Sequence, residues 1–195
     1  MNKLTLIGLC GVAGSGKSTA ARHLETFGFV RVSFADALRD LVYGQLGIKE
    51  HVKPTPPRLR RLLQVVGTEA FREYDPDHWV KQWKKTVQNL ADGTDGELRV
   101  VVDDVRFLNE AQEIKFQRGE LWQLQRAVAG LSGEAAKHVS EDLARDDTYP
   151  WDRVFHNNDS MESFLCDIEM AAGDMLHLPL DVDDADITDS FPAEE

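Results

Sequence analysis

A glycine-rich octapeptide near the start of the chain constrains the fold more than any other segment. Residues 11–18 read GVAGSGKS, which satisfies the pattern GxxxxGK[ST]; an apolar run, Lys3–Cys10, precedes them and a helical pattern, Lys17–Phe27, overlaps their end. Such a loop needs small residues, because its backbone N–H groups must close around phosphate oxygens and a bulky Cβ would hold the chain away. The N-terminus of the following helix adds partial positive charge. The octapeptide therefore predicts a strand, a phosphate-binding loop and a helix in succession.

The chemistry expected of this loop is the binding of Mg-ATP. The Lys17 ammonium can reach the β- and γ-phosphates, and the Ser18 hydroxyl can coordinate Mg²⁺. ATP and Mg²⁺ are therefore the expected cofactors. The residues expected to bind the nucleotide are Gly11, Ala13, Gly14, Ser15, Gly16, Lys17, Ser18 and Thr19.

Strand and helix patterns alternate along the chain, which predicts an α/β fold with a parallel sheet of about five strands flanked by helices. Further strands are expected at 29–34, 98–103, 120–126 and 154–157, and further helices at 36–46, 58–74, 79–90, 109–118 and 161–175. The strand at 98–103 has the clearest buried pattern and ends at Asp103 and Asp104. One of these two carboxylates is expected to support Mg²⁺ through water, and the sequence does not choose between them.

The charge of the chain limits its partners. Its net charge of −12 argues against binding to duplex nucleic acid, which requires a basic surface to displace counterions. A local arginine cluster can still hold the phosphates of a small nucleotide. Residues 181–195 carry −7 of this charge and contain no Lys or Arg, so residues 179–195 are expected to form a solvated acidic tail.

Apolar segments and cysteines point to a protein of the cytoplasm. No apolar run approaches the roughly 18 to 20 residues that span a bilayer, and the first residues lead into a strand without a cleavage site. We therefore expect a cytoplasmic protein without membrane contact. Cys10 and Cys166 lack metal-ligand spacing and are expected to be buried apolar residues rather than a disulfide.

Among nucleotide-binding classes, the sequence favours a small-molecule kinase. A GTPase normally carries an NKxD-type segment, and the nearest match, residues 157–160, lacks the lysine. Residues 131–134 are similar to the transporter ATPase signature, but they follow the aspartate-ended strand, whereas that signature precedes it. Helicases and motor ATPases need a longer chain and basic nucleic-acid surfaces. A P-loop kinase fold is the expectation that remains.

Several segments resemble the deoxynucleoside monophosphate kinases of bacteriophages, and the resemblance covers about residues 4–170. The segments are Ser33–Arg39, Leu62–Glu69, Asp75–Trp79 and Asp104–Glu110, with later matches at His138–Glu141 and Asn157–Asp159. The resemblance implies transfer of the γ-phosphoryl group of ATP to a deoxynucleoside monophosphate, with thymidylate and deoxyguanylate as the first acceptors to test. It also leaves a homodimer open and, for a phage-encoded protein, implies the host cytoplasm.

Length predicts a single domain, at residues 1–178, and the mixture of Gly, Ser and charged residues without a firm period predicts a lid at about 127–150. The resemblance implies a nucleoside monophosphate (NMP)-binding helical region at about 36–90. Arg126 and Arg145 flank this lid and are candidates for closing on the transferring phosphoryl group. Lid closure would exclude water and suppress wasteful ATP hydrolysis.

Three further residues are expected near the acceptor site. Two of them have more than one interpretation, and the third rests on the resemblance alone. Arg106 follows the strand that ends at Asp104, so it can point into the cleft at the carboxyl edge of the sheet and bind the acceptor phosphate, or form a surface salt bridge. Asp36 can N-cap the helix at 36–46 or, as the resemblance implies, lie near the acceptor phosphate and the γ-phosphoryl group. The resemblance adds Arg39 to the expected substrate-binding residues.

The helix at 58–74 has a polar face formed by Arg61, Gln64, Thr68 and Arg72. This face can be solvated or can line the nucleotide cleft. With the resemblance, Gln64 is a candidate base reader and Arg72 a candidate phosphate ligand. Trp79 can stack on a base, but it lies on the apolar stripe of its own helix, which favours packing in the core.

The expected catalytic residues are therefore Lys17, Asp36, Arg106, Arg126 and Arg145. No strong general base is needed, because a phosphate whose second pKa is about 6 is largely dianionic near neutral pH. Two alternatives remain. One is a kinase resembling dephospho-coenzyme A kinase, whose acceptor is a hydroxyl and in which Asp36 would act as a base. The other is a module that binds ATP without transferring phosphate.

Overall fold

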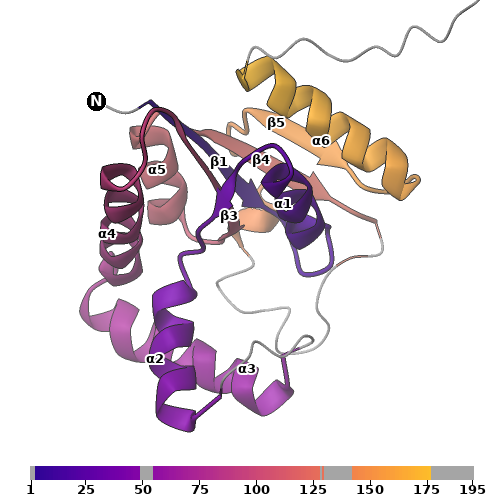
Figure 1. Ribbon diagram of the computed structural model, residues 1–195. Helices are drawn as coiled ribbons and strands as arrows, with labels where there is room; N and C mark the ends of the chain where they lie inside the picture. Colours follow the sequence, from indigo (N-terminus) through magenta and orange to yellow (C-terminus); the bar gives the residue numbers. More distant parts are fainter. Residues whose placement is uncertain (1–2, 49–54, 128, 130–141, 177–195) are drawn as a thin grey trace, which may run out of the picture.

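A five-stranded parallel sheet forms the centre of the molecule, as the alternating pattern predicts. The computed structural model describes residues 3–48, 55–127, 129 and 142–176 (Figure 1). The strands lie in the order β2-β3-β1-β4-β5. Their bounds are β1 Leu4–Cys10, β2 Val30–Arg31, β3 Leu98–Val105, β4 Glu120–Gln125 and β5 Arg153–His156. Because every pairing is parallel, all carboxyl ends meet at one edge of the sheet.

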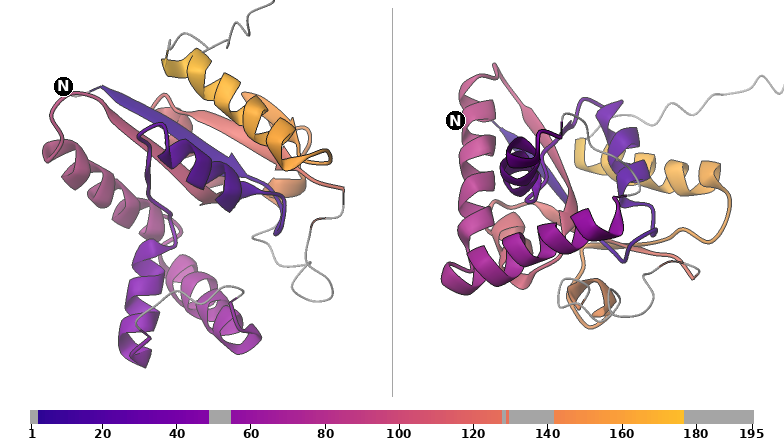
Figure 2. Two further views of the ribbon diagram at one scale, coloured as in Figure 1. Left: turned by 45° about the vertical axis from the view of Figure 1, so that its right-hand side comes forward. Right: turned by 90° about the horizontal axis from the view of Figure 1, so that it is seen from below.

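Helices cover both faces of the sheet. Their bounds are α1 Lys17–Glu25, α2 Asp36–Leu46, α3 Pro57–Gln64, η1 Val65–Arg72, α4 His78–Asp92, α5 Leu108–Phe116, η4 Leu143–Arg145 and α6 Met161–Leu176. Helices α1 and α6 pack on one face with Ile7 and Val101, whereas α4, α5 and η4 pack on the other with Leu6 and Val100 (Figure 2). Neighbouring strand residues point to opposite faces, so these continuous apolar runs supply both cores.

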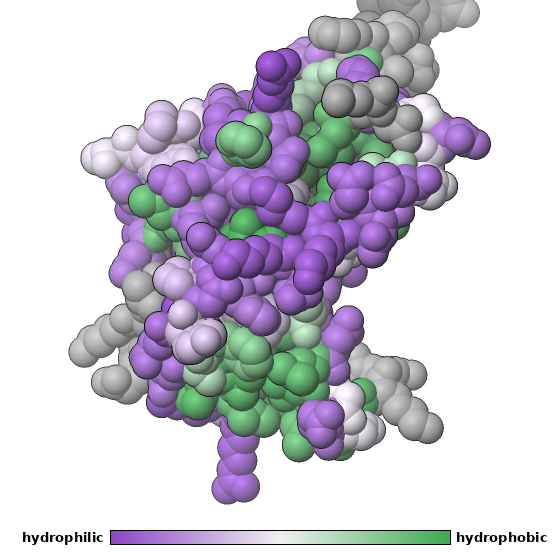
Figure 3. All heavy atoms as spheres, turned by 90° about the vertical axis from the view of Figure 1, so that its left-hand side faces the viewer, coloured by the Kyte–Doolittle hydropathy of each residue, from purple (hydrophilic) through white to green (hydrophobic). Residues whose placement is uncertain are grey.

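Helices α2, α3 and η1 project beyond the carboxyl edge of the sheet and form a lobe of their own (Figure 1). Its small core contains Leu38, Val42, Tyr43 and Trp79. Leu41, Leu46 and Leu62 of this lobe are exposed, and apolar side chains gather at this end of the molecule in Figure 3. The expected NMP-binding region, at about 36–90, contains this lobe and also α4, which packs on the sheet.

The second strand is shorter than the predicted 29–34, because side chains replace its sheet partners. Val32 is the last residue of this segment to donate its N–H to β3, at 3.0 Å from the Val101 carbonyl. The N–H of Ser33 then donates to the Asp36 carboxylate at 2.7 Å, and the N–H of Phe34 donates to Asp104 at 2.8 Å. The carboxylates therefore lead the chain out of the sheet and into α2.

The third strand is longer than the predicted 98–103 and includes both aspartates. Asp103 and Asp104 therefore point to opposite sides of the sheet, since successive strand residues alternate. The predicted helix at 58–74 begins as an α-helix but continues as a π-helix over Val65–Arg72. Both differences affect the candidate site.

One cysteine prediction is wrong. Cys10 is buried in β1, and burial raises the pKa of its thiol to about 12. Cys166 is exposed, because it lies on the outer side of α6, away from buried Phe164 and Ile168.

Within the described part of the chain, no helix is long and apolar enough to cross a membrane. The acidic tail at 179–195 and most of the lid at 127–150 lie outside the described residues.

Candidate active site

The phosphate loop follows β1 at the carboxyl edge of the sheet. A Cβ on Gly11 would lie 2.4 Å from the Leu124 carbonyl oxygen, and one on Gly16, whose φ is +112°, would lie 2.6 Å from Asn157 Nδ2. Only glycine fits such close approaches. The Lys17 ammonium donates hydrogen bonds to the carbonyls of Gly11 and Val12, at 2.5 and 2.9 Å. The loop is thus closed on itself, with α1 beginning at Lys17.

A buried asparagine from the far end of the chain supports this loop. Asn157, directly after β5, donates its Nδ2 to the Ser15 carbonyl at 3.0 Å and its backbone N–H to the Gln125 carbonyl at 2.8 Å. Its side chain therefore connects the loop to the ends of β4 and β5. The sequence placed Asn157 at the end of a strand and in a segment of the resemblance, and no local pattern marks this contact, which spans 142 residues.

The two aspartates of β3 face different parts of the site. Asp103 accepts hydrogen bonds from the hydroxyls of Ser18 at 3.3 Å and Ser33 at 2.7 Å, so it lies beside the phosphate loop. Asp104 is buried on the other side of the strand, where it accepts the N–H groups of Phe34 and Ala35. Burial raises the pKa of Asp104, although nearby Arg39 opposes this. The geometry thus separates two residues that the sequence left equivalent.

Asp36 does not cap its helix with its side chain. The N-cap of α2 is Ala35, and Asp36 is the first helical residue. One carboxylate oxygen accepts the Ser33 N–H, and the other pairs with Arg39 at 2.7 Å. Asp36 does not line the pocket described next, whereas Arg39 does. Burial lowers the pKa of Arg39, but the carboxylates of Asp104 and Asp36 more than offset this and raise it.

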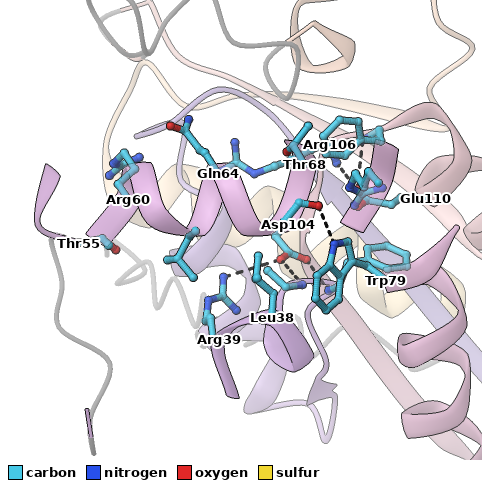
Figure 4. A pocket seen from close by; sticks show the side chains of 16 residues that line it. Leu38, Arg39, Thr55, Arg60, Gln64, Thr68, Trp79, Asp104, Arg106 and Glu110 are labelled. Atoms are coloured by element: carbon cyan, nitrogen blue, oxygen red, sulfur yellow. Dashed lines mark hydrogen bonds and ion pairs between the residues drawn. The ribbon is translucent and has the colours of Figure 1, made fainter. Parts of the chain in front are cut away.

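A pocket opens between the helical lobe and the carboxyl end of β3. It is lined by apolar side chains, by the carboxylates of Asp104 and Glu110, and by four arginines; these are Arg39, Arg60, Arg72 and Arg106. Figure 4 shows Arg60, Gln64 and Thr68 in a row along α3 and η1. The predicted residues Arg39, Gln64, Arg72, Trp79 and Arg106 therefore lie together.

Arg61 was expected on this polar face but lies outside the pocket. It pairs with Glu69 at 2.9 Å on the exposed side of the helix, and Arg60 lines the pocket instead. Arg60 and Gln64 are four residues apart within the α-helix α3, and Thr68 follows in the π-helical segment. Residues three and four positions apart share a side of an α-helix, so the helical period alone did not distinguish Arg60 from Arg61.

Arg72 is held tightly at one end of the pocket. Its guanidinium pairs with the buried carboxylate of Glu110 and lies 3.9 Å from the centre of the Phe107 ring. Sequence analysis did not single out Glu110 or Phe107 as site residues. The only local signal is a glutamate in the first turn of a helix, a common capping position. Its partner Arg72 lies 38 residues away, beyond the reach of any local pattern.

Trp79 serves the core and the pocket together. Only 3% of its surface is exposed, and its indole N–H donates to the Gly67 carbonyl at 2.8 Å. A Cβ on Gly67 would meet the Leu38 side chain at 2.6 Å, so glycine lets η1 approach α2 closely. The expected packing in the core is confirmed. The same side chain also forms part of the pocket wall.

The two arginines beside the predicted lid differ in how firmly the surrounding residues are packed against the sheet. Arg126 is exposed directly after β4. Arg145 is exposed in η4, whose neighbours Leu143 and Ala144 are buried in the main core. Two glutamines of β4, Gln123 and Gln125, also donate to the Asp147 carboxylate. Residues 142–147, at the carboxyl end of the predicted lid, are therefore anchored to the sheet.

Comparisons with solved structures agree with this architecture. Dephospho-CoA kinase from Campylobacter jejuni superposes with a TM-score of 0.54 at 14% identity, covering 90% of this chain and 98% of the other. TT1252 from Thermus thermophilus gives a TM-score of 0.53 at 20% identity, with the same coverage of the two chains. No family model matches the chain. The sheet, the phosphate loop and these likenesses define a P-loop kinase fold.

Sequence comparison narrows this class. The chain is 31% identical over 193 residues to a protein of Acanthamoeba polyphaga mimivirus described as "Putative deoxynucleotide monophosphate kinase". The match covers 85% of this chain and 94% of the viral protein. The chain therefore belongs to the deoxynucleotide monophosphate kinase family, and it is a small kinase of the phosphotransferase class.

Proposed function

We propose that this protein phosphorylates deoxynucleoside monophosphates with ATP, yielding the diphosphate and ADP. The observation that carries the proposal is the position of two sites at one edge of the sheet. The phosphate loop with Ser18 and Asp103 lies on one side of β3, and the arginine-lined pocket with Asp104 lies on the other. Ligands of open α/β sheets bind at such carboxyl edges, so a donor and an acceptor can meet there.

The charge of the pocket supports an anionic acceptor. Four arginines and two carboxylates line it, in a chain whose net charge is −12. A positive pocket on an acidic molecule concentrates small anions without attracting duplex nucleic acid. Arginine also matches phosphate oxygens with paired N–H donors. We assign acceptor binding to Arg39, Arg72 and Arg106, as the sequence predicted, and add Arg60.

The loop residues fit ATP and Mg²⁺. The Ser15 hydroxyl is buried and has no hydrogen-bond partner among the described residues, and it lies inside a loop that tolerates only glycine at two close approaches. Ser18 and Asp103 offer the hydroxyl and carboxylate oxygens that Mg²⁺ prefers. In this proposal these two residues hold the metal, whose role when bound is to neutralise charge on the β- and γ-phosphates. Lys17 binds the same phosphates.

The mechanism rests on positioning and charge neutralisation rather than on a general base. An acceptor phosphate with a second pKa of about 6 is already nucleophilic near neutral pH. Arg106 directly follows β3 and lines the pocket, at the edge of the sheet where the phosphate loop also lies. In this proposal it neutralises charge on the acceptor phosphate and on the γ-phosphoryl group. Arg126 and Arg145 are proposed to contact the transferring group, with Arg145 acting from a fixed position. Asp36 acts through Arg39, with which it pairs.

The apolar walls of the pocket suit a nucleobase. Leu38, Leu63 and Trp79 line it, and Gln64 adds an amide with donors and acceptors for a base edge. We propose that Gln64 reads the base and that Trp79 supports it from the pocket wall. Thymidylate and deoxyguanylate are the first acceptors to test.

An acceptor panel tests the proposed function. The protein is incubated with Mg-ATP and each of the common deoxynucleoside monophosphates, with ribonucleotides and dephospho-coenzyme A as comparisons. Diphosphate formation with a deoxynucleotide supports the proposal. Turnover with the hydroxyl acceptor alone supports the rival kinase, and tight ATP binding without any turnover supports a non-catalytic module. The two hydrogen bonds that engage Asp36 already disfavour its use as the base the rival needs.

Assembly and location remain proposals. A homodimer is consistent with the exposed leucines on α2 and α3, and light scattering coupled to gel filtration tests it. A cytoplasmic site of action, that of the host for a phage-encoded protein, is tested by fractionation of the source cells.

A further inference from the structure

Glu110 is a buried carboxylate in the wall of the pocket. Its side chain is only 2% exposed, it lines the acceptor pocket, and it lies in the first turn of α5. A buried carboxylate is retained only where its oxygens are fully paired. The partners of Glu110 therefore indicate what it is for.

Both of its oxygens are engaged by groups that build the pocket. Oε1 pairs with the Arg72 guanidinium, which comes from the end of η1. Oε2 accepts the backbone N–H groups of Arg106 at 2.8 Å and Phe107 at 3.1 Å. The Arg72 guanidinium carbon in turn lies over the Phe107 ring, 3.9 Å from the ring centre. One carboxylate thus connects η1 to the turn between β3 and α5 (Figure 4).

We infer that Glu110 is a positioning residue for acceptor binding: it holds Arg72 and the Arg106 backbone in place so that both cations face the acceptor phosphate. The inference rests on the proposed function. Glu110 does not bind the phosphate itself, because its oxygens are occupied and a carboxylate repels an anion. Capping alone would need only the Phe107 N–H, so the contacts to Arg72 and Arg106 are extra.

Glutamine at this position separates positioning from folding. In Glu110→Gln the amide oxygen still accepts the backbone N–H groups, but the amide NH₂ faces the Arg72 donors and loses the ion pair. We expect the KM for the deoxynucleotide to rise about tenfold or more, as for the loss of a charged hydrogen bond, while the KM for ATP changes less than about twofold. The matched control is Glu113→Gln on the same helix, which removes an ion pair with Lys84 outside the pocket and should leave both KM values unchanged.

A double-mutant cycle with Arg72→Gln completes the test. If Glu110 acts through Arg72, Glu110→Gln adds little to the acceptor KM once Arg72 is replaced. Circular dichroism shows whether Glu110→Gln folds. If it does not fold, Arg72→Gln is the variant that tests the inference. Arg72→Gln must then raise the acceptor KM and leave the KM for ATP unchanged, and any other result overturns the inference. Equal changes in both KM values, no change, or full additivity in the cycle also overturn it. A wild-type protein that phosphorylates no deoxynucleotide overturns the proposed function as well, whereas an active wild type with an unaltered acceptor KM in the variants overturns only the role of Glu110.

Discussion

Replacing each of the two neighbouring aspartates by asparagine should produce opposite kinds of defect. Asp103→Asn removes a carboxylate that faces Ser18 and the phosphate loop, so we expect it to impair metal-dependent transfer. Asp104→Asn removes the buried carboxylate that ends β2 by accepting the N–H groups of Phe34 and Ala35, so we expect it to impair stability.

The structure sets the size of each effect. An asparagine at 104 offers one oxygen to two backbone donors, at 2.8 and 3.1 Å, and its NH₂ faces them as a third donor. Leaving one buried N–H without an acceptor costs about 1–3 kcal/mol, or about 2–12 °C in Tm for a chain of this size. At position 103 the Ser18 and Ser33 hydroxyls can reorient toward the amide, so the change in Tm should stay below about 2 °C. Activity should fall about 10- to 100-fold there, as for other losses of metal-ligand support.

Thermal unfolding and a coupled kinase assay with a Mg²⁺ titration measure both variants. Asp103→Asn should need more Mg²⁺ for half-maximal activity, and Asp104→Asn should show a near-normal Mg²⁺ requirement at temperatures where it is folded. The reasoning is wrong if Asp104→Asn loses Mg²⁺-dependent activity at an unchanged Tm while Asp103→Asn remains fully active.

Two further predictions concern the loop and the buried glutamate. Gly16→Ala should lower the free energy of unfolding by about 1–3 kcal/mol in urea titrations and raise the KM for ATP. The reason is that its Cβ would lie 2.6 Å from Asn157 Nδ2 at a φ of +112°. A free energy of unfolding and a KM equal to those of the wild type would refute the tight contact. Burial raises the pKa of Glu110 from 4.5 to about 7, although Arg72 opposes this. Between these two pH values the folded state binds a proton more readily than the unfolded state does, and the ion pair with Arg72 is complete only above about pH 7. The free energy of unfolding of the wild type should therefore fall relative to that of Glu110→Gln as the pH rises from about 4.5 to about 7, by a few kcal/mol at most. Urea titrations in which the difference between the two proteins stays constant over this pH range would contradict the prediction.

The sequence predicted the elements whose causes are local. The phosphate loop follows from small residues next to a lysine, and the parallel sheet follows from apolar runs alternating with amphipathic helices. Contacts between residues far apart in the sequence determined the remaining features of the fold. The second strand ends early because the carboxylates of Asp36 and Asp104 accept the next N–H groups, and Asp104 lies 70 residues after its partner Phe34 along the chain.

The composition of the pocket was predictable in kind but not in every residue. Arg39, Gln64, Arg72, Trp79 and Arg106 were expected near the acceptor, and they line one pocket. Arg60 lines the pocket in place of the expected Arg61, and the period of the α-helix that contains both did not distinguish them. Glu110 could not be assigned, because its function depends on a partner in another helix.

The central claim is that the loop near the start of the chain and the arginine pocket act on one pair of nucleotides. It is tested most directly by following the γ-phosphoryl group of radiolabelled ATP into a deoxynucleoside monophosphate, with the wild type and Lys17→Ala compared side by side. The account predicts that the label appears as the terminal phosphate of the diphosphate with the wild type and that the folded Lys17→Ala variant transfers almost none. Label found only in inorganic phosphate, or equal transfer by both proteins, would contradict it.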